Sequence, residues 1–302
     1  MKEREAIGLK ELLKRWHGMT SGTDHPQAPA YDGQDIKLTN IVEHTNHVEA
    51  GSCFIARVRT GTDGHPYIGR ALEQGASLIV GQRDVEAIDA NLNGVPYLQV
   101  QDSAVAEAWL AASMYNFPSK ELVLIGVTGT DGKTTTTNLI FDIVRRSDVH
   151  AGMLSTIKAS IGRQDEALAL HVTTPEAPII QAYLRRMVEA GLTHCVLEVT
   201  SHSLAQHRVD AVEFDIAVHT NITHEHLDYH GDYDGYFEAK SRLFRSLNGP
   251  LWNQKENCAE KAALRKTAVL NRDDASYDSL AELVKGRIIS YGIEKASDVS
   301  AA

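Results

Sequence analysis

A short turn rich in glycine and threonine, placed directly after an apolar stretch, constrains the fold of this chain more than any other feature. The stretch is LVLIGV at residues 122–127, and TGTDGKTTTT follows at residues 128–137. Glycines let backbone N–H groups approach phosphate oxygens, and a helix N-terminus offers further free N–H groups. The sequence therefore predicts a buried strand, a phosphate-binding loop over 129–135 and a helix from about Lys133 to Arg146.

Within this loop, two side chains have the chemistry that a bound nucleotide requires. The Lys133 ammonium can reach the β- and γ-phosphates, and the Thr134 hydroxyl can be a ligand of Mg²⁺. The strict pattern GxxxxGK[ST] is missed by one position, because Val127 stands where it requires glycine. A glycine-rich turn with an exposed lysine is the alternative, but it does not explain four consecutive threonines at a helix start. The predicted ATP contacts in the loop are Gly129, Thr130, Asp131, Gly132, Lys133, Thr134 and Thr135.

Short apolar strands alternate with helical patterns along most of the chain, which favours an α/β fold. At 302 residues the chain is long enough for two domains. The segment NFPS at 116–119 interrupts the alternation, so we expect one domain at 1–118 and another at 119–302. The strands of the second domain are continuous apolar runs, as in a mostly parallel sheet flanked by helices on both faces.

Composition excludes several classes of function. The formal charge of −10 argues against general nucleic-acid binding, which requires a basic face. The apolar runs are too short to span a bilayer, and the charged start MKEREAIGLKELLKRW has no apolar core of a signal peptide. The three cysteines are far apart and contain no CxxC pair, which is typical of reduced thiols. We therefore expect a cytoplasmic protein that binds neither nucleic acid nor membrane.

The loop sequence TGTDGKTTT resembles the nucleotide loop of the Mur ligase family, which joins amino acids to growing peptides at the expense of ATP. That family's loop reads TGT(N/D)GKT(S/T) and also lacks the first glycine. Three later segments follow in the order and spacing of the tripeptide-forming members of the family. They are HVTTPEA at 171–177, LEVTSHSLAQHRVD at 197–210 and HTNITHEHLDYHGDYDGYFEAKSRLF at 219–244.

The resemblance implies a reaction and its participants. Tripeptide-forming Mur ligases add the third residue, usually lysine or meso-diaminopimelate, to UDP-N-acetylmuramoyl-L-Ala-D-Glu during peptidoglycan biosynthesis. A substrate carboxylate attacks the γ-phosphate of ATP, and an amine then displaces phosphate from the acyl phosphate. Both steps gather negative charge, so Mg²⁺ and fixed cations are needed. The implied fold is a small N-terminal α/β UDP-sugar domain followed by a P-loop-type central domain.

Four side chains are implied as ligands of the metal ions. Thr134 and Glu198, which ends a predicted strand, would hold Mg²⁺. His226 resembles the family's second metal ligand, and Lys240 matches the lysine that the family carbamoylates. Lys133, Glu198, His226 and Lys240 are thus the expected catalytic residues. Plainer readings are a satisfied carboxylate at 198, an exposed helix lysine at 240 and a zinc site in HEHLDYH, although the HExxH spacing of zinc sites is absent.

Other positions resemble substrate contacts of the family. Thr173, Thr174, Thr200 and Arg208 match positions that touch the UDP-linked substrate, and a guanidinium suits a carboxylate or phosphate. The family usually has serine at the position of Thr200 and aspartate at that of Glu225. Asn271 resembles the residue that reads the adenine edge, with Asp274 close by in VLNRDD.

The first domain matches less well. SCFIARVRTGTDGHPYI resembles the family pattern DLFVAxxGxxxDGHxFI, but an Asp-Ser-Arg triplet that commonly precedes it is replaced by His44, Thr45 and Asn46. Of these three residues, we expect only Thr45 to contact the substrate. The missing arginine bears on the uridine end of the substrate and leaves the ATP interpretation intact.

Tripeptide-forming ligases have a third domain that selects the amino acid, and no counterpart precedes Ala302. We expect a monomeric fragment that binds Mg–ATP but ligates poorly. Two other interpretations stay open. One is another ligase of the superfamily, such as a cyanophycin synthetase or, less well matched at the N-terminus, a folylpolyglutamate synthetase. The other is a non-catalytic module that binds nucleotide or UDP-sugar.

Overall fold

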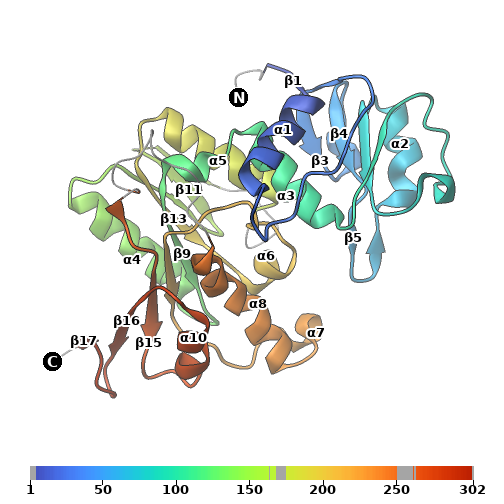
Figure 1. Ribbon diagram of the computed structural model, residues 1–302. Helices are drawn as coiled ribbons and strands as arrows, with labels where there is room; N and C mark the ends of the chain where they lie inside the picture. The colour runs from blue at the N-terminus through green and yellow to red at the C-terminus, as the bar shows by residue number, and fades with distance from the viewer. Residues whose placement is uncertain (1–4, 163, 168–174, 250–260, 262, 301–302) are drawn as a thin grey trace. The chain divides into compact units, whose positions relative to one another are not determined.

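The computed structural model describes residues 5–162, 164–167, 175–249, 261 and 263–300. Within these residues the chain forms two compact units. The first unit combines residues 1–117 with the short segment 206–211, and the second combines 118–205 with 212–302. Both units mix strands and helices (Figure 1), so the predicted α/β class is confirmed.

The described part of the first unit is built on a four-stranded parallel sheet with the order β3-β4-β7-β8. Its strands are β3 (Asn40–Val42), β4 (Ser52–Ile55), β7 (Leu78–Gly81) and β8 (Tyr97–Gln99). The two central strands are buried along their whole length, as their apolar sequences predict. Two short ladders accompany them, formed by β1 (Ile7–Gly8) with β2 (Lys37–Leu38) and by β5 (Val58–Arg59) with β6 (Thr62–Asp63).

The helices of the first unit are α1 (Leu9–Thr20), α2 (Ile68–Glu73) and α3 (Ser103–Met114). Helix α3 begins at a side-chain cap, because the Asp102 carboxylate accepts hydrogen bonds from the N–H groups of Ala104 and Val105 at 2.7 and 3.1 Å. Helix α1 packs against it, with the rings of Trp16 and Trp109 stacked at 6.0 Å between centroids. Nearly the whole of α3 is therefore buried.

The described part of the second unit contains a nine-stranded sheet with the order β12-β11-β10-β13-β9-β14-β15-β16-β17. Strands β10 to β17 in this order run parallel, and β11 and β12 form an antiparallel edge. The bounds are β9 (Val123–Thr128), β10 (Ala151–Leu154), β11 (Lys158–Ile161), β12 (Gln164–Ala167), β13 (His194–Glu198), β14 (Ile216–His219), β15 (Thr267–Asn271), β16 (Arg287–Gly292) and β17 (Val299–Ser300). The expected mostly parallel sheet is confirmed.

Helices cover both faces of this sheet (Figure 1). Ile125 and Val127 of β9 pack with Phe141 of α4 on one face. On the other face, a Cβ at Gly126 would lie 2.8 Å from the Phe214 ring and 3.0 Å from Leu243 of α8. The alternation along β9 thus assigns its side chains to the two helical layers. The helices are α4 (Lys133–Arg146), α5 (Ala177–Glu189), α6 (Ser201–Ala205), α7 (Leu227–His230), α8 (Tyr233–Arg245) and α10 (Tyr277–Leu283).

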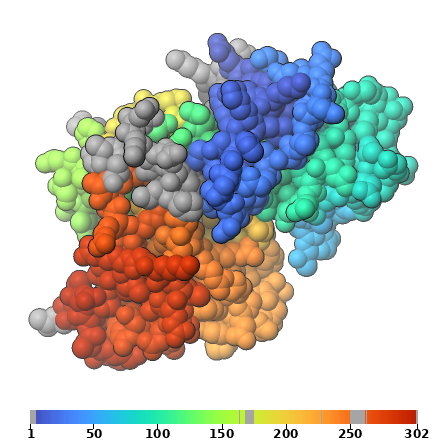
Figure 2. Space-filling model, viewed as in Figure 1, coloured from blue at the N-terminus to red at the C-terminus, as the bar shows by residue number. Residues whose placement is uncertain are grey.

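Helix α10 packs against α8, and the orange and red segments of this unit share one continuous surface (Figure 2). None of the helices within the described ranges is long and apolar enough to cross a lipid bilayer. Most of the segment 255–266 lies outside the described residues. One of its residues, Lys261, is fully buried and donates to Asp215 Oδ2 at 2.6 Å and to the Leu122 carbonyl at 3.0 Å.

Candidate functional site

The predicted phosphate loop lies at the carboxyl edge of the parallel sheet. It joins β9 to α4, and the ends of β13 and β14 flank it, because these strands pair with β9 on either side. Ligands of open parallel α/β sheets bind at this edge. The edge therefore brings together residues that are far apart in the sequence.

The loop backbone depends on two glycines. A Cβ at Gly129 would lie 1.8 Å from Thr220 Oγ1 and 3.0 Å from the Asn221 carbonyl oxygen, so no larger residue fits without a shift of the chain. Gly132, directly before α4, has φ of 78°, in the left-handed region. Glycine is thus required at both positions by the geometry of the turn.

The segment after β14 holds the loop in place. The N–H of Thr130 donates to the Asn221 carbonyl at 2.7 Å, and the N–H of Asp131 donates to Asn221 Oδ1 at 2.9 Å. The Thr220 hydroxyl donates to the Asp131 carbonyl at 2.7 Å. The loop is therefore fixed by hydrogen bonds to Thr220 and Asn221, two residues that the sequence analysis did not single out.

Polar side chains gather where the loop enters α4. Lys133 Nζ donates to the Thr130 carbonyl at 2.7 Å and so folds back over the loop. The Thr134 hydroxyl donates to Glu198 Oε1 at 2.9 Å, and the other oxygen of that carboxylate accepts from the N–H of Thr156 at 3.2 Å. Glu198 is buried at the end of β13. A hydroxyl and a buried carboxylate thus meet beside the loop, and their role as ligands of one cation stays a prediction.

Lys240 of α8 also reaches the loop. Its Nζ donates to the Gly129 carbonyl at 2.5 Å and lies 4.6 Å from the centre of the Tyr236 ring. The side chain is only 1% exposed. Burial, reinforced by the positive charge of Lys133, lowers the pKa of Lys240 to about 7. Lys240 is therefore not an ordinary exposed helix lysine.

Tyr236 connects this lysine to the segment that carries His226. Its hydroxyl lies 3.1 Å from Thr130 Oγ1 and donates to Glu225 Oε2 at 3.5 Å. The His226 ring lies 6.2 Å from the Tyr236 ring and 4.9 Å from that of His202. His226 is partly exposed, and its φ is 53°. The geometry places His226 beside the loop through Tyr236, a residue that the sequence analysis missed.

The predicted adenine-side residues lie at the end of β15. Asn271 Nδ2 donates to the Thr220 carbonyl at 2.8 Å, so this amide supports the strand end that holds the loop. The Asp274 carboxylate accepts from the N–H of Ile222 at 3.3 Å and lies 3.6 Å from His219 Nε2. Burial lowers the pKa of His219 to about 4, although Asp274 opposes this shift. Both predicted residues thus share contacts with the β14 turn.

The predicted substrate residues are divided between the units. Thr173 and Thr174 lie outside the described residues. Thr200 is buried beside α6, where its hydroxyl accepts from the N–H of Ser203 at 3.1 Å. Arg208 and Thr45 belong to the first unit, Thr45 as the start of a 3₁₀ turn at Thr45–His47. Their roles stay predictions.

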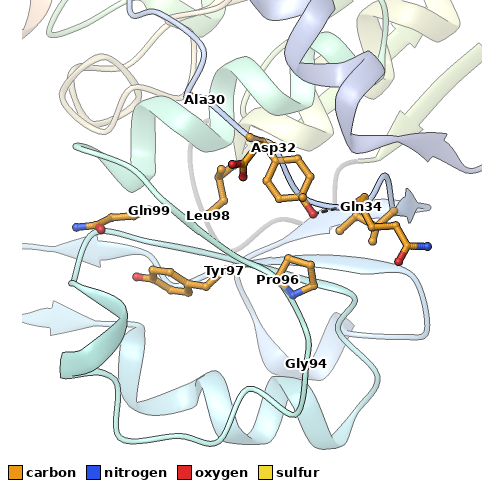
Figure 3. A pocket seen from close by; sticks show the side chains of 11 residues that line it. Ala30, Asp32, Gln34, Gly94, Pro96, Tyr97, Leu98 and Gln99 are labelled. Carbon is orange, nitrogen blue, oxygen red and sulfur yellow. Dashed lines mark hydrogen bonds between the residues drawn. The ribbon is translucent and has the colours of Figure 1, made fainter.

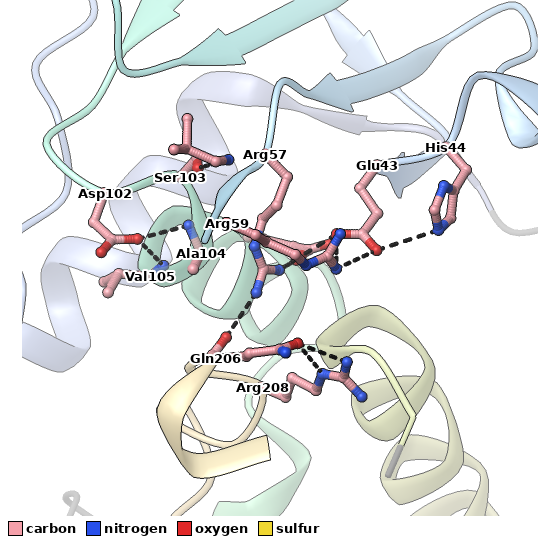
Figure 4. A network of polar contacts seen from close by, with 12 residues as sticks. Glu43, His44, Arg57, Arg59, Asp102, Ser103, Ala104, Val105, Gln206 and Arg208 are labelled. Carbon is pink, nitrogen blue, oxygen red and sulfur yellow. Dashed lines mark hydrogen bonds and ion pairs between the residues drawn. The ribbon is translucent and has the colours of Figure 1, made fainter. Parts of the chain in front are cut away.

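A hollow of the first unit lies between the segment 30–36 and strand β8 (Figure 3). Its volume is about 560 Å³, and Tyr31, Pro96 and Tyr97 contribute to its lining. None of the predicted site residues lines it. Sequence reasoning also missed a buried charge network around Arg57 (Figure 4), whose only signal is a single glutamate in the apolar stretch AVAEAWLAASM.

Comparisons with known proteins find relatives over most of the chain. A family model described as the Mur ligase middle domain matches residues 127–302. A UDP-N-acetylmuramoyl-L-alanyl-D-glutamate--2,6-diaminopimelate ligase of Bacillus licheniformis is 36% identical over 274 residues, covering 90% of this chain and 53% of that protein. A UDP-N-acetylmuramyl-tripeptide synthetase of a Roseiflexus species is 38% identical over 269 residues, covering 88% of this chain and 51% of that protein.

Solved structures show the same fold. The structure of a UDP-N-acetylmuramoyl-L-alanyl-D-glutamate--2,6-diaminopimelate ligase superposes with a TM-score of 0.72 at 23% identity, covering 98% of this chain and 55% of that one. A structure of MurF from Acinetobacter baumannii gives 0.58 at 20% identity, covering 99% and 56%. The chain spans about half the length of the curated relatives that it matches.

Proposed function

This chain belongs to the Mur ligase family, and from that premise we propose that its whole protein is an ATP-dependent ligase of peptidoglycan biosynthesis. The enzyme adds the third amino acid to UDP-N-acetylmuramoyl-L-Ala-D-Glu. The substrate carboxylate attacks the γ-phosphorus of ATP, which releases ADP and leaves an acyl phosphate. The incoming amine then attacks the acyl carbon, phosphate leaves, and an amide remains. The amino acid is lysine or 2,6-diaminopimelate, and the names of the relatives favour the second.

The observation that carries this proposal is the Lys240 amine at the phosphate loop. Its contact with the Gly129 carbonyl and its burial place a titrating amine within the loop that would hold ATP. With a pKa of about 7, much of this amine is neutral at physiological pH. A ligase that carbamoylates a lysine requires such an amine, buried and partly neutral, beside its nucleotide loop.

The carbamate forms when the Lys240 amine adds to CO₂. The lone pair of the neutral Nζ attacks the carbon of CO₂ and a C–N bond forms. One C=O π bond breaks and its electron pair moves to oxygen, and Nζ loses one proton to solvent. The product carries one negative charge in place of a partly neutral amine. Such an anion would change Lys240 from a cationic hydrogen-bond donor into an oxygen ligand.

The residues beside the loop fit magnesium. The Thr134 hydroxyl and the Glu198 carboxylate are hard oxygen donors that already lie 2.9 Å apart, and His226 and the Lys240 carbamate would complete the set. When bound, the metal ion supplies positive charge that stabilises the phosphates. Lys133 contributes fixed charge to the same end, and Gly129 to Thr135 provide backbone N–H groups.

The remaining assignments follow the family pattern. Asn271 and Asp274 would contact the adenine side of ATP, close to the turn that supports the loop. Thr173, Thr174, Thr200, Arg208 and Thr45 would contact the UDP-linked peptide substrate. A buried guanidinium such as Arg208 suits an anionic group of that substrate.

The test is a ligation assay on the whole protein with ATP, Mg²⁺, UDP-N-acetylmuramoyl-L-Ala-D-Glu and a panel of amino acids. We expect ADP release and tripeptide formation with one diamino acid. Lys240→Ala should abolish activity, and short carboxylic acids should partly restore it by occupying the place of the carbamate. ATP binding without amide formation from any amino acid would reject the ligase in favour of a nucleotide-binding module.

A further inference from the structure

A buried network of charges lies in the first unit, away from the phosphate loop in sequence (Figure 4). Arg57 is 4% exposed, and Glu107, in the middle of helix α3, has no exposed surface. Charged side chains are rarely buried to this extent, since removal from water is costly unless each charge has partners. The burial of Arg57 therefore depends on the partners of its guanidinium.

The two terminal nitrogens of the Arg57 guanidinium bind different partners. Nη1 forms a hydrogen-bonded ion pair with Glu107 and lies 3.5 Å from Glu43 Oε2. Nη2 donates to the main-chain carbonyl of Gln206 at 2.7 Å. Glu43 in turn accepts from Arg59 at 2.7 Å on both of its oxygens. The carboxylates thus fix the direction of Arg57, and Arg57 fixes the backbone at Gln206.

Gln206 opens the short segment 206–211, which is part of the first unit although the chain on either side of it belongs to the second. Its side-chain oxygen accepts from Arg208 Nε at 3.1 Å and from Nη2 at 2.7 Å. One residue therefore has its backbone held by Arg57 and its side chain holding Arg208. The contacts form a continuous path from Glu107 to the Arg208 guanidinium.

We propose that Arg57 is a positioning residue, which anchors the segment 206–211 and so orients Arg208 towards an anionic group of the substrate. This inference rests on the proposed function, because Arg208 has a substrate role only there. The group is a carboxylate or a phosphate, both of which match the planar fork of a guanidinium. Arg57 itself does not touch the substrate.

The shape of the arginine side chain explains why another positive charge could not take the place of Arg57. A lysine at 57 keeps one positive charge for Glu107, but its ammonium is a single point and lacks the rigid fork that serves two partners at fixed angles. Arg57→Lys should therefore preserve the ion pair and lose the hydrogen bond to Gln206. Arg15→Lys is the matched control, because Arg15 in the same unit also pairs with a glutamate, Glu11, and donates to a main-chain carbonyl, that of Ser113.

The first measurement is hydrogen exchange of the amides in 206–211, made on this chain without ligand. We expect exchange about tenfold faster in Arg57→Lys, as one charged hydrogen bond is lost, and wild-type rates there in Arg15→Lys. Unchanged exchange in Arg57→Lys would overturn the anchoring. If Arg57→Lys does not fold, Arg57→Leu combined with Glu107→Leu removes both buried charges together and should give the same faster exchange.

The second measurement is the affinity of the chain for UDP-N-acetylmuramoyl-L-Ala-D-Glu and for ATP, by calorimetry. Arg57→Lys should weaken the first about tenfold and leave the second unchanged. A merely structural role would weaken both. In a background of Arg208→Gln, Arg57→Lys should cause no further loss, whereas additive losses would overturn the proposal.

Titration with UDP alone separates the two anionic groups. If Arg57→Lys loses affinity for the muramoyl dipeptide alone, the group at Arg208 is a peptide carboxylate. An equal loss of affinity for UDP supports the diphosphate. No loss with either ligand overturns the proposal. If the wild-type chain binds ATP but no muramoyl dipeptide, the proposed function fails, and the exchange rates still decide whether Arg57 anchors 206–211.

Discussion

Lys240 shows how the burial of one side chain can change its chemistry. An exposed lysine is almost entirely an ammonium at physiological pH, and the ammonium has no lone pair to attack CO₂. Burial in α8 beneath the loop, together with Lys133, brings the pKa of Lys240 to about 7. The proposed modification therefore follows from the environment of this residue.

Carbamate formation on Lys240 should depend on pH in a defined direction. The pKa is lowered, so the neutral fraction of the amine rises from about one tenth at pH 6 to about nine tenths at pH 8. With ¹³CO₂ held at constant dissolved concentration, the ¹³C NMR signal of a carbamate should grow over this range. The signal should be absent in Lys240→Arg, and its persistence there would assign it to another amine.

Lys133 should contribute to nucleotide affinity directly. Lys133→Ala removes a charged donor from the phosphate loop, so ATP should bind roughly ten- to a hundredfold more weakly. Isothermal titration of the purified chain measures this, with Lys120→Ala, outside the loop in sequence, as the control. Unchanged ATP affinity in Lys133→Ala would count against the loop as the phosphate site.

Sequence patterns identified residues whose chemistry is local, and missed those whose role depends on contacts across the fold. Lys133 and Thr134 follow from the loop pattern alone. Tyr236, Asn221 and Arg57 have no motif of their own, because an aromatic, an amide and an arginine acquire their roles only through partners distant in the sequence. The one hint for the last of these was Glu107, a charge within an apolar helix.

At the scale of elements, the strand β9, the loop and the helix α4 form one strand–loop–helix motif. The expected helix bounds, Lys133 to Arg146, agree with the structure because the loop fixes where α4 begins. The predicted strand at 122–127 ends one residue later, at Thr128. The hairpin of β11 and β12 was not predicted, since its exposed, polar edge strand gives no apolar run.

Thr220, directly after β14, approaches the loop so closely that Gly129 tolerates substitution least in this motif. A Cβ there would overlap Thr220, so Gly129→Ala should lower the free energy of unfolding by about 2 to 3 kcal/mol through overpacking. Gly191→Ala is the control, because Gly191 has φ of 74° but open space around it, and about 1 kcal/mol is expected. Thermal unfolding of both variants compares the losses. Equal losses would show that the clash is relieved without cost.

At the scale of the whole molecule, the two units divide the proposed work. The second unit carries the loop, Glu198, His226 and Lys240, whereas the first carries Thr45 and Arg208. The fold class and the parallel sheet were predictable from alternating patterns. The assignment of 206–211 to the first unit was not predictable, because nothing in LAQHRVD indicates that the chain passes there from one unit to the other.

The chain spans about half the length of the relatives that it matches, and this leads to a prediction about the isolated 302 residues. We expect them to bind Mg–ATP and to form little amide from UDP-N-acetylmuramoyl-L-Ala-D-Glu and either diamino acid. A coupled assay for ADP, with mass spectrometry of the nucleotide product, measures both. Substantial tripeptide formation by the chain alone would refute the second half of this prediction.

The excursion of 206–211 means that no single cut divides this polypeptide into its two units. The chain passes from one unit to the other after Phe117, after Ala205 and after Ala211. A gene truncated at codon 117 would encode a first unit whose Arg57 has lost its carbonyl partner. To study the two units separately, residues 206–211 would therefore have to be joined to the N-terminal piece. The other piece would need a linker between residues 205 and 212.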